Sequence, residues 1–131
     1  MPMRLATVRE VLEATVLAGE NGLGAEIRFG CASDLMSDVL AFSLPEGILL
    51  TGHTTPQVIY TAEMAALKAV CFVRGKQPQG EVPELARARG IVVMSSGLPM
   101  FECCGRLHAR GLPGCMAPSR NGRPLGASRR A

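Results

Sequence analysis

The stretch "ILLTGHTTPQVIYTAEMAAL", residues 48–67, decides the fold. An apolar run over residues 48–50 ends at Thr51-Gly52-His53, and Thr54-Thr55-Pro56 then opens an amphipathic segment with a proline in its first turn. A strand, a glycine turn and a helix start, in this order, are typical of α/β proteins that hold a phosphate or a nucleotide. The stretch therefore predicts a β-α unit whose turn either binds a ligand or only connects two elements.

The alternation of strand and helix continues to residue 109. Residues 69–73 are apolar on both faces, as a buried strand of a parallel sheet requires, and residues 82–89 form a helix that Gly90 ends. Residues 91–94 are a third strand, and residues 98–109 are a last helix. We therefore expect an α/β fold, a three-layer sandwich with a mainly parallel β-sheet built from repeated β-α-β units.

The patterns before residue 48 are weaker. Thr7-Val8-Arg9-Glu10 has the Thr-x-x-Glu spacing of a capping box and predicts the start of a helix, with one face running from Val8 to Thr15. Residues 26–29 alternate polar and apolar, which indicates a short, half-buried strand. A short helix is expected over residues 34–42.

Length and composition narrow the class of protein. The chain of 131 residues is long enough for one domain with a sizeable core, and 47% of it is hydrophobic without any Trp. No stretch has the length of a membrane span, and the N-terminus lacks the pattern of a signal peptide. Five cysteines, two of them adjacent, do not form the framework of a secreted disulfide protein. We expect a cytoplasmic protein with no membrane partner.

Charge is distributed unevenly along the chain. Up to Gly105, eight Lys and Arg stand against eleven Asp and Glu, whereas the rest of the chain holds six Arg and no acid. A mildly acidic body is not the basic field of a nucleic-acid-binding fold, so we do not expect nucleic acid as a partner. Gly, Pro, Ser and Arg dominate from Gly111 onward, which predicts a domain over residues 1–110 and a flexible basic tail over residues 111–131.

Four stretches resemble the DRTGG domain family: "FGCASDLMSDVLAF", "LLTGHTTPQVIYTAEMA", "AVCFVRGKQP" and "ARARGIVVMSSGLPMFECCGRL". The resemblance covers nearly all of residues 7–110. It is strongest to small stand-alone members similar to proteins encoded near iron-only hydrogenase genes, and the family is similar in fold to the N-terminal domain of HPr kinase/phosphorylase. The resemblance implies a compact α/β sandwich, commonly a homodimer, with a regulatory role.

The chain also departs from that family. It contains no Asp-Arg-Thr-Gly-Gly string, and Arg74-Gly75-Lys76 stands where relatives carry a turn similar to Thr-Gly-Gly. The family implies no catalytic residues, so the motif that names it supplies no site here.

Two glycine turns indicate a candidate ligand-binding site. "LLTGHTTPQV" and "FVRGKQPQGEV" both run from a strand through a glycine to Pro-Gln, although such turns often use glycine without binding anything. The carboxyl ends of parallel strands meet at one edge of a sheet, where hydroxyls, free N–H groups and two cations would suit an anionic ligand. The predicted site residues are Thr51, Gly52, His53, Thr54, Arg74, Gly75, Lys76, Ser95 and Ser96.

Two further clusters have a simpler structural explanation. Asp34 and Asp38 are four residues apart and could hold a metal ion, but the favoured interpretation is that Ser33 and Asp34 cap a helix while Asp38 lies in water. Cys103, Cys104, His108 and Cys115 could form part of a metal site, although adjacent cysteines lack the usual chelating spacing. We expect these cysteines to pack as small apolar residues, and we predict no metal and no cofactor.

The functional expectation follows from these points. No nucleophile, base and orienting group form a recognisable set, so we expect no enzyme, with His53 and Lys76 as the weakest alternative. The leading hypothesis is a non-catalytic regulatory or accessory domain, homodimeric and hydrogenase-related, that binds a small anionic metabolite such as a nucleotide. The alternative is an interaction or scaffold protein that docks on a partner enzyme through its dimer surface and basic tail.

Overall fold

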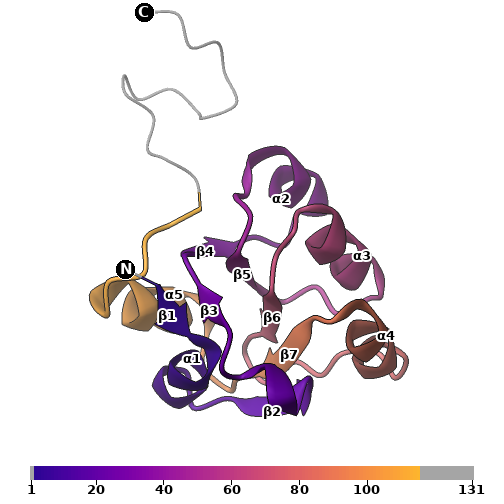
Figure 1. The fold of residues 1–131 in the computed structure, drawn as a ribbon, viewed down its shortest axis with the longest axis horizontal. Coiled ribbons are helices and arrows are strands. Elements are labelled where there is room, and N and C mark those ends of the chain that lie inside the picture. The colour runs from indigo at the N-terminus through magenta and orange to yellow at the C-terminus, as the bar shows by residue number, and fades with distance from the viewer. Residues whose placement is uncertain (1, 116–131) are drawn as a thin grey trace, which may run out of the picture.

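Five strands form the central sheet of the computed structural model, which describes residues 2–115 (Figure 1). Four of the strands are parallel to one another, and β2 at one edge is antiparallel to β7. The order across the sheet is β2 (Thr15–Ala18), β7 (Val92–Ser95), β6 (Ala69–Phe72), β5 (Gly47–Thr51) and β4 (Phe29–Ala32). The predicted, mainly parallel α/β sheet is confirmed.

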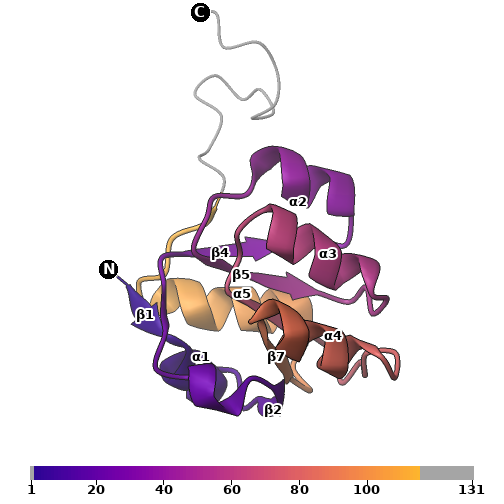
Figure 2. The ribbon, with the colours of Figure 1, turned by 45° about the vertical axis from the view of Figure 1, so that its right-hand side comes forward.

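Helices cover both faces of this sheet (Figure 2). One face packs against α2 (Met36–Phe42), α3 (Gln57–Met64) and α4 (Val82–Arg89), and the other against α1 (Leu5–Val11) and α5 (Met100–Ala109). The predicted three-layer sandwich is therefore confirmed. Within residues 2–115, no helix has both the length and the apolar character that crossing a membrane would require.

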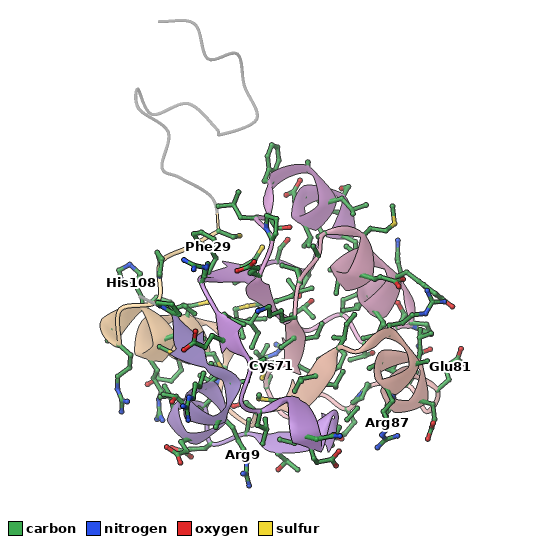
Figure 3. The ribbon with its side chains drawn as sticks, viewed as in Figure 1. Arg9, Phe29, Cys71, Glu81, Arg87 and His108 are labelled. Atoms are coloured by element: carbon green, nitrogen blue, oxygen red, sulfur yellow. The ribbon has the colours of Figure 1, made fainter. Side chains whose placement is uncertain are left out.

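Alternation along the strands divides the core into two halves. Ile48 and Leu50 face α1 and α5, whereas Leu49 between them faces α2, α3 and α4. Each such fully buried aliphatic side chain stabilises the fold by about 1.5–3 kcal/mol. Cys71 lies in the interior, while Arg87 lies on the surface (Figure 3). Strands with two apolar faces account for the continuous hydrophobic runs in the sequence.

The N-terminal helix differs from the prediction. It begins at Leu5, with Arg4 as its N-cap and no side-chain cap, so Thr7 lies inside the helix and the predicted capping box is wrong. The amides of Leu5 and Ala6 instead donate to the carbonyl oxygens of Ala25 and Leu23, both at 2.9 Å. Backbone carbonyl groups from a later segment therefore accept the hydrogen bonds that a capping side chain would otherwise accept.

The strands of the N-terminal half also differ. Thr15 was predicted on a helix face but begins β2. The predicted strand over residues 26–29 is divided between β3 (Glu26–Ile27), which pairs with β1 (Met3–Arg4) in a separate small sheet, and β4. A short 3₁₀ helix, η1 (Glu20–Gly22), lies between β2 and β3. Because β4 extends to Ala32, the chain reaches the carboxyl edge of the sheet three residues later than predicted.

Residues 111–115, which we call the strap, lie along the outer edge of β4. The amide of Gly30 donates to the carbonyl oxygen of Pro113 at 2.9 Å, and the amide of Cys115 donates to the carbonyl oxygen of Gly30 at 2.8 Å. Leu112 and Cys115 are buried. The boundary after Arg110 stays a prediction, and residues 116–131 of the predicted tail lie outside the described residues.

Candidate functional site

The two glycine turns are neighbours at the carboxyl edge of the sheet. β5 and β6 pair directly, and the amide of Val73 donates to the carbonyl oxygen of Thr51 at 3.1 Å. Further out, the amide of Gln79 donates to the carbonyl oxygen of Thr54 at 3.0 Å, which joins the β5–α3 loop to the β6–α4 loop. The predicted juxtaposition of these loops is therefore present.

Asp34 holds the β5–α3 turn in place. Its Oδ1 accepts hydrogen bonds from the amide of Gly52 at 2.7 Å and from the hydroxyl of Thr51 at 3.0 Å. Thr51 is fully buried, and its Oγ1 accepts a hydrogen bond from the amide of His53 at 3.1 Å. A chain of three hydrogen bonds thus links the end of β4 to the turn after β5.

This role of Asp34 corrects the prediction that it caps a helix. The N-cap of α2 is Leu35, whose amide donates to the hydroxyl of Ser33 at 3.0 Å. Asp34 reaches the neighbouring loop instead, because it lies beyond the end of β4 on the same edge as Gly52 and Arg74. It is a site residue that the sequence interpretation missed, and the missed end of β4 was the reason.

The environment of Asp34 favours its charged form. The amide of Gly52 is the main cause that lowers the pKa of this carboxyl group, with the hydroxyl of Thr51 and the charges of Arg74 and His53 acting in the same direction. Partial burial opposes these effects without reversing them. The carboxylate is therefore ionised at neutral pH and accepts hydrogen bonds without donating any.

His53 is tied to the start of α3. Its Nε2 lies 2.9 Å from the hydroxyl oxygen of Thr55, and the tautomer decides which of the two donates. This contact joins the imidazole to the residue just before the N-cap of α3. Sequence patterns did not identify Thr55 as a partner, because the pairing depends on the conformation of the turn.

The β6–α4 turn has a different backbone. Arg74 and Gly75 both lie in the left-handed region, with φ of 59° and 69°. The amide of Arg74 donates to the carbonyl oxygen of Leu98, and that of Gly75 to the carbonyl oxygen of Ser96, both at 2.8 Å. The side chains of Arg74 and Lys76 are exposed, and neither forms an ion pair within 4 Å inside the described part of the chain.

Ser95 and Ser96 hold loops together. The buried hydroxyl of Ser95 donates to the carbonyl oxygen of Lys76 at 3.1 Å and accepts from the side-chain Nε2 of Gln77 at 3.3 Å. The hydroxyl of Ser96 donates to the carbonyl oxygen of Leu12 at 2.7 Å and accepts from the amide of Leu98 at 3.1 Å. Both hydroxyls have internal partners, and their contact with a ligand stays a prediction.

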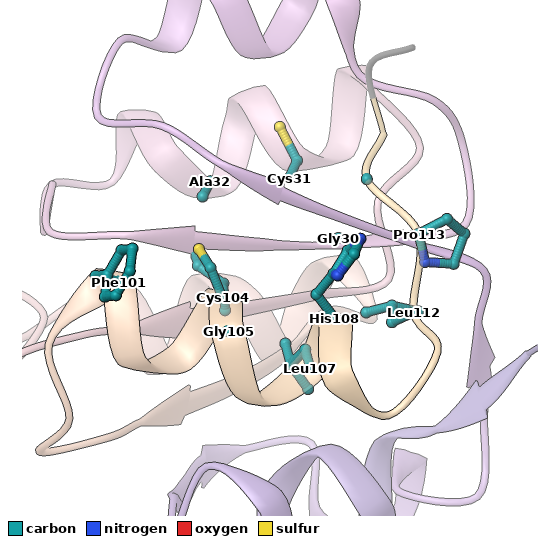
Figure 4. A pocket seen from close by; sticks show the side chains of 12 residues that line it. Gly30, Cys31, Ala32, Phe101, Cys104, Gly105, Leu107, His108, Leu112 and Pro113 are labelled. Carbon is teal, nitrogen blue, oxygen red and sulfur yellow. The ribbon is translucent and has the colours of Figure 1, made fainter. Parts of the chain in front are cut away.

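A second feature is a hollow of about 400 Å³ between β4, α5 and the strap (Figure 4). We call it the α5 groove. Its walls are mainly apolar, with Ala32 and Leu50 from the sheet and Cys104 and His108 from α5. Phe101 stands at its rim and is 87% exposed. None of the predicted site residues lines this groove, which sequence patterns did not identify.

The residues considered for a metal site do not converge. Cys103 packs on the face of the sheet that carries α1 and α5, whereas Cys115 packs on the opposite face. Cys104 and His108 line the α5 groove. Between residues 2 and 115, no group of three or more His, Cys, Asp or Glu side chains is placed to hold a metal ion.

Comparison with known proteins supports the fold. No family model and no curated protein matches the sequence. Among solved structures, the CBS and DRTGG domains of the regulatory region of a Clostridium perfringens pyrophosphatase, complexed with its activator diadenosine tetraphosphate, match with a TM-score of 0.66 and 19% identity. The match covers 87% of this chain and half of the other. The fold of this chain is DRTGG-like.

Proposed function

We propose that this chain is a non-catalytic regulatory domain that binds a small anionic metabolite, namely a nucleotide, at the carboxyl edge of its sheet. One observation supports this most: the charge of the exposed Arg74 acts on the ionised carboxylate of Asp34, and the exposed Lys76 lies on the same turn as Arg74. Cations that form no ion pair in the described part of the chain attract phosphate, and the hydrogen-bonded backbone of the two turns gives the ligand a fixed surface.

The carboxylate argues for a nucleotide over a bare phosphate. Within residues 2–115, both hydrogen bonds to Asp34 end on Oδ1, which leaves Oδ2 to accept from a ligand hydroxyl. Ribose supplies such hydroxyls, whereas an inorganic polyphosphate has no hydroxyl to donate to this carboxylate and gains only the attraction of the two cations. The similarity to a regulatory region complexed with a dinucleotide activator agrees with this ligand class.

Thermal unfolding with candidate ligands tests the proposal. AMP, ADP, ATP and diadenosine tetraphosphate would be compared with tripolyphosphate, which has the charge but no hydroxyl. A ligand at a hundred times its Kd stabilises the folded state by about 2.7 kcal/mol, so a nucleotide should raise Tm by several degrees and tripolyphosphate at the same concentration should raise it clearly less.

Charge variants test whether the nucleotide binds at the carboxyl edge of the sheet. Arg74→Gln combined with Lys76→Gln should weaken nucleotide binding at least tenfold, because two phosphate contacts are lost. Arg9→Gln removes an exposed charge from α1, which covers one face of the sheet rather than its carboxyl edge, and serves as the matched control. No shift with any nucleotide at millimolar concentration, or an equal shift in the double variant, would exclude the site.

The exposed Phe101 favours a second candidate, in which the chain docks on a partner enzyme. An aromatic side chain that is 87% exposed beside an apolar groove is typical of contact surfaces. In this proposal the chain is a homodimer that associates with a hydrogenase-related enzyme, as the DRTGG resemblance implies, and residues 116–131 contribute basic contacts.

Light scattering and a deletion separate the two candidates. A dimer at micromolar concentration that Phe101→Ala dissociates would support the second one, with Met64→Ala as the control because Met64 is 73% exposed on α3. A monomeric wild-type chain would contradict it. Removal of residues 116–131 should leave nucleotide binding intact and weaken capture of a purified hydrogenase.

A further inference from the structure

Two cysteines lie opposite one another where the strap meets β4. Gly30 and Gly114 form a parallel bridge, so the next residues of the two segments, Cys31 and Cys115, are also opposite. The amide of Cys115 donates to the carbonyl oxygen of Gly30 at 2.8 Å, which holds the two backbones together at that position. Paired strands run ~4.8 Å apart, inside the Cα separation of about 4.4–6.8 Å that a disulfide spans.

The side chains of this pair share one environment. Cys31 and Cys115 are 2% and 4% exposed, and both pack on the face of the sheet that carries α2, α3 and α4. Interaction between the two thiols is the main cause that raises the pKa of Cys31 and lowers that of Cys115. Cys71, Cys103 and Cys104 pack on the other face of the sheet, so Cys31 and Cys115 form a separate pair, although Cys31 and Cys104 both line the α5 groove.

We propose that Cys31 and Cys115 are a thiol–disulfide site, at which a low-molecular-weight disulfide oxidises the pair and fastens the strap to β4. The inference is independent of the nucleotide site, because neither cysteine belongs to the carboxyl edge of the sheet.

Exchange proceeds in two balanced steps. The thiolate of Cys115 attacks one sulfur of the small disulfide, whose S–S bond breaks and whose other half leaves as a thiolate that takes a proton from water. Cys31 then loses its proton and attacks the sulfur of Cys115, expelling the second half as a thiol. Two protein thiols are oxidised to one disulfide, and one small disulfide is reduced to two thiols.

Access to the buried Cys115 comes from local opening of the strap. Among residues 2–115, two backbone hydrogen bonds join the strap to Gly30 of β4, and two more tie the amides of Gly111 and Leu112 to carbonyl oxygens at the end of α5. The side chain of Leu112 is buried. Short edge segments with so few contacts open at a small fraction of the global free energy of unfolding. Pro113 and Gly114 also line the α5 groove, so oxidation would fix one wall of that groove.

Peptide mapping of the full chain detects the bond directly. Trypsin cleaves after Arg28, Lys68, Arg110 and Arg120, which places Cys31 in the peptide 29–68 and Cys115 in the peptide 111–120, apart from every other cysteine. After treatment with oxidised glutathione, these two peptides should appear joined, lighter by two hydrogens, in protein that runs as a single chain on a non-reducing gel. Reduction should separate them again.

Stability gives a second readout. Closing so long a loop should raise Tm by roughly 5–15 °C in oxidised protein, and Cys115→Ser should abolish the rise while Cys104→Ser keeps it. A link between Cys104 and Cys115, a link between two chains, or free Cys31 after complete oxidation of the other thiols would overturn the proposal.

Discussion

The β5–α3 turn and the β6–α4 turn share a sequence pattern, yet different forces hold them. At Gly52 the backbone has no left-handed φ, and the carboxylate of Asp34 binds its amide. At Gly75 the backbone is left-handed with φ of 69°, and the amide binds the carbonyl oxygen of Ser96. One turn is therefore fixed by a charged side chain and the other by backbone conformation.

The space around the two glycines differs as well. A Cβ at Gly52 would lie 3.6 Å from Asp34 Oδ1, an ordinary contact, whereas a Cβ at Gly75 would meet nothing within 4 Å but would be strained by the φ angle. Glycine at 75 is thus favoured by the left-handed backbone, whereas glycine at 52 only leaves room beside a carboxylate. Glycine therefore occurs at the corresponding position of the two turns for two different physical reasons.

Thr51→Val should have the largest effect on this comparison. It keeps the shape of a fully buried side chain but removes the hydroxyl that donates to Asp34 and accepts from the amide of His53. Leaving a buried amide without its acceptor costs about 1–3 kcal/mol, and urea unfolding should show a loss near 2–3 kcal/mol. Thr51→Ser, which keeps the hydroxyl, should lose clearly less; an equal loss would mean that packing, not hydrogen bonding, holds the turn.

Gly75→Ala should have the second largest effect. It should lower the free energy of unfolding by about 1–2 kcal/mol, because a Cβ is disfavoured at a left-handed φ. Gly75→Asn is the control, since Asn tolerates this conformation better than Ala and should cost less. If both substitutions cost nothing in urea unfolding, the left-handed backbone is not needed for the β6–α4 turn.

Acid should weaken the β5–α3 turn selectively. The folded-state pKa of Asp34 is lowered, so its contribution is present above the unfolded value near 3.9 and is lost as pH falls through the folded-state pKa. Asp34→Asn should therefore flatten the decline in stability below about pH 4, while Asp38→Asn should keep the wild-type decline. If Tm falls with pH in the same way for the wild type and for Asp34→Asn, protonation of Asp34 is not the cause of the loss of stability in acid.

Gly52→Ala should have the smallest effect on stability, within about 0.5 kcal/mol, because the added Cβ meets only ordinary contacts. Under the proposed function it should still weaken nucleotide binding, since the methyl group occupies space beside the carboxylate. A loss larger than that of Gly75→Ala would reverse the comparison between the two turns.

The β-α-β half of the fold was predictable because its information is local. Strands buried on both faces must be continuous apolar runs, and the turns after them carry glycine or proline. The first helix was predicted with the wrong start, because its end is satisfied by the carbonyl oxygens of Leu23 and Ala25, and no local pattern reveals that contact.

The site was predictable to a similar degree. Parallel strands end at one edge, so the two glycine turns had to be neighbours. The role of Asp34 depended on where β4 ends, which its short, mixed sequence did not determine. The ligand contact predicted for Ser96 stays a prediction, and no local pattern could reveal that its hydroxyl binds the carbonyl oxygen of Leu12, 84 residues away in the sequence.

The strap also determines where this chain can be cut. A chain shortened to Arg110 would lose both hydrogen bonds to Gly30 and leave the outer edge of β4 open. Open edges template pairing with other copies, so that shortened protein should self-associate and aggregate through β4. A dimer measured on it would report the missing strap, whereas a chain that ends after Cys115 keeps the edge covered and gives an oligomeric state that can be interpreted.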